Sequence, residues 1–125
     1  MTSPSVAEPY VYIFVRKDLP AEQQAVQAIH ASIESAKHFD FPKDPPNIVL
    51  CHVKDEGSLD EHCNTMLEAG VRYQAIREPD MDYHLTAAAT EPICGERRKM
   101  FRKFRLLRFA PVAQRQSVSA LNGEC

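Results

Sequence analysis

Three polar residues of one short segment share a narrow arc of a predicted helix. Gln23, Gln27 and His30, followed by Glu34, are spaced as i, i+4, i+7 and i+11. At 3.6 residues per turn this spacing keeps them within an arc of roughly 60°. An amide both donates and accepts hydrogen bonds, and an imidazole can titrate near neutral pH. The arc could therefore orient a water molecule or a carbonyl group; the alternative is a polar helix shoulder with a structural histidine.

A carboxylate near the end of a later predicted strand is the second candidate. Glu78 follows the segment VRYQAI (71–76) and is flanked by Arg77. A carboxylate placed to accept a proton from water contributes about 10²- to 10⁴-fold to a hydrolysis rate. Asp80 and Asp82 lie nearby and are rivals for this role. A solvated loop carboxylate is the alternative explanation for Glu78.

Two adjacent pairs, Cys51-His52 and His62-Cys63, raise a zinc hypothesis because thiolate and imidazole are good zinc ligands. Neighbouring residues on a strand point to opposite faces, and Cys63 fits the buried stripe of a helix. We therefore expect neither a metal nor another cofactor. The four cysteines contain no C-x-x-C pair, which favours reduced thiols over a disulfide framework.

Basic residues are concentrated near the end of the chain. Residues 97–108 hold seven of the 15 Lys and Arg residues and no acid, although the net charge of the protein is −2. Such a block produces a positive field that attracts polyanions such as RNA, and a solvated face is the alternative. We expect substrate contacts from Arg16 and Lys17, at the end of the first predicted strand, and from Arg97, Arg98, Lys99, Arg102 and Lys103.

The elements that must position these residues alternate between strands and helices. We predict strands at 10–15, 47–53, 71–76 and 84–90, and helices at about 18–38, 58–70 and 96–104. Asp18 is expected to cap the first helix, with Pro20 in its first turn. Ser58 and Glu61 form a capping box for the second helix. Gly70 is placed to end that helix in a left-handed turn.

The element order β-α-β-α-β-β-α predicts an α/β fold with a mixed four-stranded sheet and helices on both faces. The segment RLL (105–107) could add to the sheet. In the first helix we expect the stripe of Val26, Ile29 and Ile33 to pack inward, next to a second face of small residues. We expect a flexible start at 1–9, one domain at 10–108 and a mobile tail at 109–125.

The longest strongly apolar run, Tyr10 to Val15, is far shorter than the roughly 20 residues of a membrane-spanning helix. The first residues show no charged-then-apolar signal pattern. We therefore expect a cytoplasmic protein that does not enter a membrane.

Seven short motifs occur in a fixed order along the chain: VRKDL, AVQAIHA, NIVL, EGSLDEH, AIREPD, LTAAATEP and KFRLL. In this order and spacing the sequence resembles the type 2 (archaeal and eukaryotic-type) peptidyl-tRNA hydrolases over about residues 10–108. It is most similar to a subgroup of shorter homologues, the peptidyl-tRNA hydrolase domain-containing proteins. The resemblance implies cleavage of the ester between peptide and tRNA without a metal, on a mixed-sheet α/β fold that is often dimeric.

The resemblance also implies the catalytic residues. The family glutamine corresponds to Gln27, the place of the family aspartate is taken by Glu78, and the family threonine corresponds to Thr86. The family lysine is absent, because Gln23 stands where it would be. A neutral amide cannot stabilise developing negative charge as an ammonium does, and such stabilisation is often worth several kcal/mol. Arg16 or Lys17 must then supply the charge, or turnover must be weak.

Two other classes of function remain open on the sequence. A non-catalytic module could have kept the fold and an RNA or protein partner after losing the lysine. A structural dimer subunit could act only through the small-residue face of the first helix. Peptidyl-tRNA binding is expected of the hydrolase, whereas the dimer subunit is expected to show no salt-dependent RNA binding.

Overall fold

Segments rich in β-branched and aromatic residues form the centre of the protein, which is described here by a computed structural model over residues 8–106. The strands are β1 (Tyr10–Arg16), β2 (Asn47–Val53), β3 (Tyr73–Glu78), β4 (His84–Thr90) and β5 (Arg105–Leu106). The helices are α1 (Ala21–His38) and α2 (Glu56–Glu68), with the 3₁₀ helices η1 (Pro79–Met81) and η2 (Gly95–Phe101). Most of the expected flexible start and all of the expected tail lie outside the described residues.

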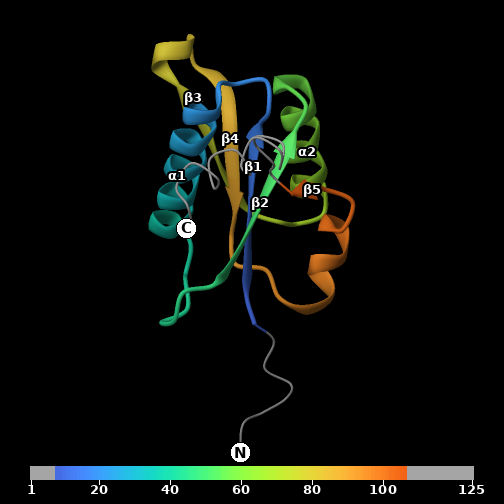
Figure 1. Ribbon diagram of the computed structural model, residues 1–125. Coiled ribbons are helices and arrows are strands. Elements are labelled where there is room, and N and C mark those ends of the chain that lie inside the picture. Colours follow the sequence, from blue (N-terminus) through green and yellow to red (C-terminus); the bar gives the residue numbers. More distant parts are fainter. Residues whose placement is uncertain (1–7, 107–125) are drawn as a thin grey trace, which may run out of the picture.

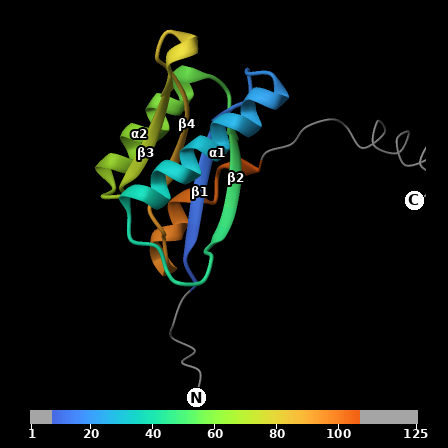
Figure 2. The same ribbon diagram turned by 90° about the vertical axis from the view of Figure 1, so that its left-hand side faces the viewer.

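The strands form one mixed sheet in the order β3-β4-β1-β2-β5. β1 and β2 are parallel, whereas β4 is antiparallel to both of its neighbours, β1 and β3. α1 covers one face of the sheet, and α2 and η2 cover the other (Figure 1; Figure 2 shows α1 in front of the sheet). The predicted α/β class and its four principal strands are confirmed, and the segment beginning at Arg105 does add to the sheet, beside β2. The chain directions bring the carboxyl ends of β1, β2 and β3 to the same edge.

The face of α1 that packs on the sheet is not the one expected from the sequence. Val26, Ile29 and Ile33 are 42%, 56% and 51% exposed, so the prediction that this stripe packs inward is wrong. The residues of α1 that are buried are Gln24, Gln27, Ala28, Ala31 and Ser35. The reason lies in the strand beneath the helix, because the backbones can approach closely only where both surfaces carry small side chains.

The alanines of β4 form that surface. Ala87 and Ala89 are fully buried and belong to the same core cluster as Ala28 and Ala31 of α1. The Ser35 hydroxyl donates a 2.7 Å hydrogen bond to the carbonyl of Thr90, which fixes the far end of the helix on the same strand.

We predict that Ala87→Leu destabilises the protein by about 1–3 kcal/mol, because the added atoms must push α1 away from the sheet. Ile29→Ser, on the exposed side of the same helix, should change the free energy of unfolding by no more than about 0.5 kcal/mol. Urea unfolding monitored by circular dichroism measures both changes. Equal stability of Ala87→Leu and the wild type would contradict this close packing.

Aromatic side chains fill the opposite face of the sheet. Tyr12 stacks on Phe101 with ring centroids 4.0 Å apart, and Phe14 contacts Phe104 edge-on at 4.7 Å. The segment that carries Phe101 was predicted as an α-helix over about 96–104 but is the 3₁₀ helix η2. In an α-helix the bases four residues apart, Arg98 with Arg102 and Lys99 with Lys103, would be neighbours on the helix surface. Like charges at this spacing destabilise an α-helix.

The start of α1 also differs from the prediction. Asp18 does not cap the helix: its carboxylate accepts two hydrogen bonds from the Arg16 guanidinium, at 2.9 and 3.0 Å. Pro20 occupies the N-cap position, with no side-chain hydrogen bond. Pairing with Arg16 takes the carboxylate away from the helix N–H groups.

α2 begins two residues earlier than predicted. Asp55 is its N-cap and accepts a 2.9 Å hydrogen bond from the backbone N–H of Ser58, so the capping box built on Ser58 is wrong. The predicted end is confirmed, because Gly70 follows the helix with φ of +79°. A residue with a Cβ would be strained in that left-handed conformation.

A buried carboxylate connects the strands to η2. Glu91 is 7% exposed and accepts hydrogen bonds from the backbone N–H and the guanidinium of Arg72 and from the guanidinium of Arg97. Burial alone would raise the pKa of Glu91, but the hydrogen bonds from Arg72 and Arg97 outweigh it and lower the pKa.

We predict that Glu91→Gln lowers the free energy of unfolding by about 1–2 kcal/mol at pH 7, because it removes a charged acceptor of several hydrogen bonds. A lowered pKa stabilises the fold above the unfolded-state value of about 4.3, and this contribution is lost as the pH falls through the folded-state pKa. The difference between variant and wild type should therefore shrink below about pH 4. A difference that is constant between pH 7 and pH 3 in denaturant titrations would contradict this role of the carboxylate.

Within residues 8–106, no helix combines the length and the apolar character needed to cross a membrane.

Candidate active site

Three of the predicted site residues form a continuous chain of hydrogen bonds. The Thr86 hydroxyl donates to Gln27 Oε1 at 2.8 Å, and Gln27 Nε2 donates to Glu78 Oε1 at 2.9 Å. Because the amide oxygen is occupied by the hydroxyl, the amide NH₂ group must face the carboxylate. Gln27 is 1% exposed, so its orientation is also fixed by packing. The chain therefore holds one oxygen of Glu78 in a defined place.

An irregularity in the sheet turns Thr86 toward α1. Ile76 pairs with Ala87 and Arg77 pairs with Leu85, which leaves Thr86 as an extra residue in β4. Such a bulge re-aims a side chain and occurs often beside functional sites. Thr86 is fully buried, so its hydroxyl can position Gln27 but has no access to a substrate.

Glu78 is the last residue of β3, at a strand end as expected, although the strand ends two residues later than predicted. It is half-buried and borders a hollow of about 430 Å³ between α1 and the edge strand β3. His30 lies in the wall of the same hollow, with the apolar side chains of Ile33 and Ile76. A carboxylate at the rim of a partly apolar hollow is suited to activating water beside a bound acyl group.

Gln23 contacts the chain only weakly. Its side-chain oxygen accepts a hydrogen bond from Gln27 Nε2 at 3.4 Å, which is longer than a typical N–H···O bond. The structure thus brings together Gln23, Gln27, Glu78 and Thr86, and His30 lines the same hollow as Glu78.

Neither cation expected to replace the family lysine contacts this group. The Arg16 guanidinium binds Asp18 and donates to the carbonyl of Leu85 at 3.1 Å. The hydrogen bonds that Arg16 donates to the Asp18 carboxylate raise the pKa of Arg16. Lys17 borders a different pocket, beyond the end of β2. Within the part of the chain that the structure describes, Glu78 forms no ion pair.

Several bases of the 97–108 segment have partners within the protein. Arg97 pairs with Glu91, and Lys99 pairs with Glu96. Arg98 Nε donates to the Tyr12 hydroxyl at 2.8 Å. These contacts reduce the number of bases available to a polyanion.

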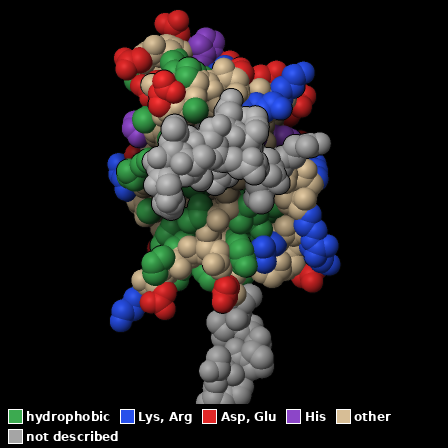
Figure 3. Space-filling view, in the orientation of Figure 1, with side chains coloured by type: hydrophobic (Ala, Val, Ile, Leu, Met, Phe, Trp, Pro, Cys, Tyr) green, Lys and Arg blue, Asp and Glu red, His purple; other side chains and the backbone are tan. Residues whose placement is uncertain are grey.

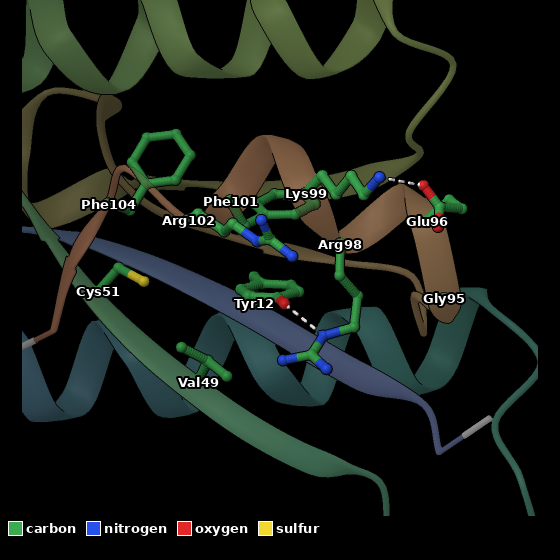
Figure 4. A pocket seen from close by; sticks show the side chains of 10 residues that line it. All are labelled: Tyr12, Val49, Cys51, Gly95, Glu96, Arg98, Lys99, Phe101, Arg102 and Phe104. Carbon is green, nitrogen blue, oxygen red and sulfur yellow. Dashed lines mark hydrogen bonds and ion pairs between the residues drawn. The ribbon is translucent and has the colours of Figure 1, made fainter.

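Arg98, Lys99 and Arg102 lie at a second pocket, whereas Lys103 lines a third. Figure 4 shows Arg98, Lys99 and Arg102 around a pocket of about 430 Å³. Arg98 also stacks over the Tyr10 ring, 3.4 Å from its centroid. Arg102 forms no ion pair with any residue from 8 to 106.

Sequence reasoning missed Gln24, which is buried beside the end of β1. Its Nε2 group donates to the carbonyls of Lys17 and Leu19, and its Oε1 accepts from His52 Nε2 at 2.6 Å. The feature of the sequence that could have identified Gln24 is its position three residues before Gln27, which places both on the same face of the helix.

The cysteines of the two adjacent Cys-His pairs are buried. Desolvation raises the pKa of Cys51 to about 11, and that of Cys63, also mainly by burial, to about 11. Across the described residues, no three His, Cys, Asp or Glu side chains are grouped to hold a metal ion. Both thiols therefore behave as core side chains.

Comparison of the sequence with models of known protein families and with curated proteins gives no significant match.

Proposed function

We propose that the protein hydrolyses the ester bond of peptidyl-tRNA, releasing peptide and free tRNA. The observation that supports this most is the Thr86–Gln27–Glu78 chain of hydrogen bonds, which ends in a carboxylate at the rim of a hollow. If Gln27 served only to stabilise the fold, its side-chain amide would not need to donate to a carboxylate at the rim of the hollow. An oriented carboxylate there is what a water-activating base requires.

In the proposed reaction Glu78 accepts a proton from a water molecule, whose oxygen adds to the ester carbonyl. The carbon–oxygen bond to the tRNA ribose then breaks, and the ribose oxygen takes the proton from Glu78. Gln27 and Thr86 act as positioning residues, because their polar atoms are occupied by the chain. We assign to His30, which lines the hollow, the role of donor to the developing oxyanion.

The substrate would be recognised in two parts. The apolar wall formed by Ile33 and Ile76 suits the acyl portion, without demanding a particular side chain. The phosphates of the tRNA would meet the Lys and Arg side chains of η2, on the right-hand side of Figure 3. We place this activity in the cytoplasm, where peptidyl-tRNA is produced.

The alternative is a module that binds RNA or protein without hydrolysis. The absence of an ion-pair partner for Glu78 among the described residues favours it, because the charge that the family lysine would supply is missing. A paired assay separates the two: filter retention of tRNA and release of a blocked amino acid from N-acetylaminoacyl-tRNA, measured on the same preparation. Release supports the hydrolase, and retention without release would establish the module.

A further inference from the structure

A strongly basic pocket of about 390 Å³ lies where β1 and β2 end. Lys17 follows β1, Lys54 follows β2, and Lys103 follows η2, so three distant segments each bring an ammonium-bearing side chain. His52 and His62 complete the ionisable groups of its lining. No described carboxylate lines the pocket.

Among residues 8–106 the three lysines have no counter-ions. None of Lys17, Lys54 and Lys103 forms an ion pair with another residue of the described chain. Two acids are adjacent to these lysines in the sequence. Asp18 accepts hydrogen bonds from the Arg16 guanidinium, and Asp55 accepts one from the backbone N–H of Ser58 as the cap of α2. Neither carboxylate lines the pocket, whose lining therefore carries an excess of positive charge.

The excess of positive charge contributes to lowering the pKa values of the two histidines in the pocket. Burial and then the nearby Lys17 ammonium lower the pKa of His52. Burial and then Lys103 lower the pKa of His62, with Glu61 acting in the opposite direction. The His52 ring is held by its hydrogen bond to Gln24.

We propose that this pocket binds a phosphate group of an RNA chain. Three ammonium groups that form no ion pair with a described residue, two of them at the carboxyl ends of the parallel strands β1 and β2, form the kind of cationic site that holds a phosphate. Glu78 ends β3 at the same edge of the sheet, so an RNA held here would lie along the edge that carries the candidate active site. The choice of RNA rests on the proposed function. The binding of a phosphate group does not depend on the proposed function, since the phosphate of a free nucleotide would contact the same side chains.

The first experiment follows the C2 protons of His52 and His62 by NMR during pH titrations with and without inorganic phosphate. A bound phosphate should raise the pKa of both rings, because it offsets the lysine charges that lower them. The double variant Lys54→Gln/Lys103→Gln should lose this response. The control Lys37→Gln/Lys43→Gln, which removes two charges at the opposite end of the sheet, should keep it. Unchanged titration curves at saturating phosphate would overturn the proposal.

The second experiment measures tRNA affinity against salt concentration. Loss of two phosphate-contacting charges should weaken binding at least about tenfold at low salt and reduce the slope of log K against log salt by about 2. The control pair should leave both quantities unchanged. Equal losses in both double variants would overturn the assignment to RNA, even if inorganic phosphate still shifts the histidines.

These outcomes are separate from a failure of the proposed function. An intact protein that releases no amino acid from blocked aminoacyl-tRNA would refute the hydrolase but would not affect the phosphate titration. Hydrolysis with no phosphate response in the pocket would refute the pocket alone.

Discussion

Glu78→Gln should lower the rate of ester hydrolysis by about 10²- to 10⁴-fold while leaving tRNA affinity unchanged. The substitution keeps the shape of the side chain, and its amide oxygen can still accept the hydrogen bond from Gln27 Nε2. What it removes is the ability to take a proton from water. Single-turnover release of a labelled blocked amino acid from tRNA measures the rate, and filter binding measures the affinity.

Asp80→Asn is the matched control, since this exposed carboxylate follows two residues later in η1. It should leave both quantities as in the wild type. A Glu78→Gln protein that releases the amino acid at the wild-type rate would show that Glu78 is not the base, and a loss confined to Asp80→Asn would move the base to that rival.

Gln23→Lys should raise the hydrolysis rate by about tenfold or more. The side chain of Gln23 already contacts Gln27 and lies near Glu78, which has no cationic partner among the described residues. An ammonium at this position would stabilise the oxyanion that forms when water adds to the ester, and one well-placed donor can be worth about 10²- to 10³-fold. The rate is measured in the same single-turnover assay.

Gln23→Met separates the effect of charge from that of packing, because it has a similar length without a charge or a hydrogen-bonding group. It should not exceed the wild-type rate. If Gln23→Met and Gln23→Lys are equally fast, the missing ammonium does not limit the hydrolysis rate. The explanation that the oxyanion lacks a stabilising charge would then be wrong.

The strands could be predicted from the sequence because each is marked by the residue types within its own segment. The segments 47–53 and 84–90 coincide with β2 and β4, and the α/β class followed from the order of the elements. The packing face of α1 could not be predicted, because it depends on the alanines of β4. Val26, Ile29 and Ile33 form the more apolar stripe, but close approach to that strand selects the smaller residues.

The contacts of the candidate site depend on both the helix spacing and long-range structure. The spacing of Gln23 and Gln27 placed them on one arc, whereas the bonds from Gln27 to Glu78 and Thr86 join residues 51 and 59 positions apart. The bulge that turns Thr86 toward α1 arises from the pairing of two strands and leaves no signal in either alone. Likewise, Lys17, Lys54 and Lys103 share a pocket only because their segments end at one edge of the sheet.

Hydrolysis of blocked aminoacyl-tRNA in ¹⁸O-labelled water tests the central claim most directly, with mass spectrometry of both products. Attack of a Glu78-activated water on the ester carbon predicts one ¹⁸O atom in the carboxylate of the released amino acid and none in the tRNA ribose. Label in the ribose, release without label, or no release by the wild-type protein above that of Glu78→Gln would contradict it.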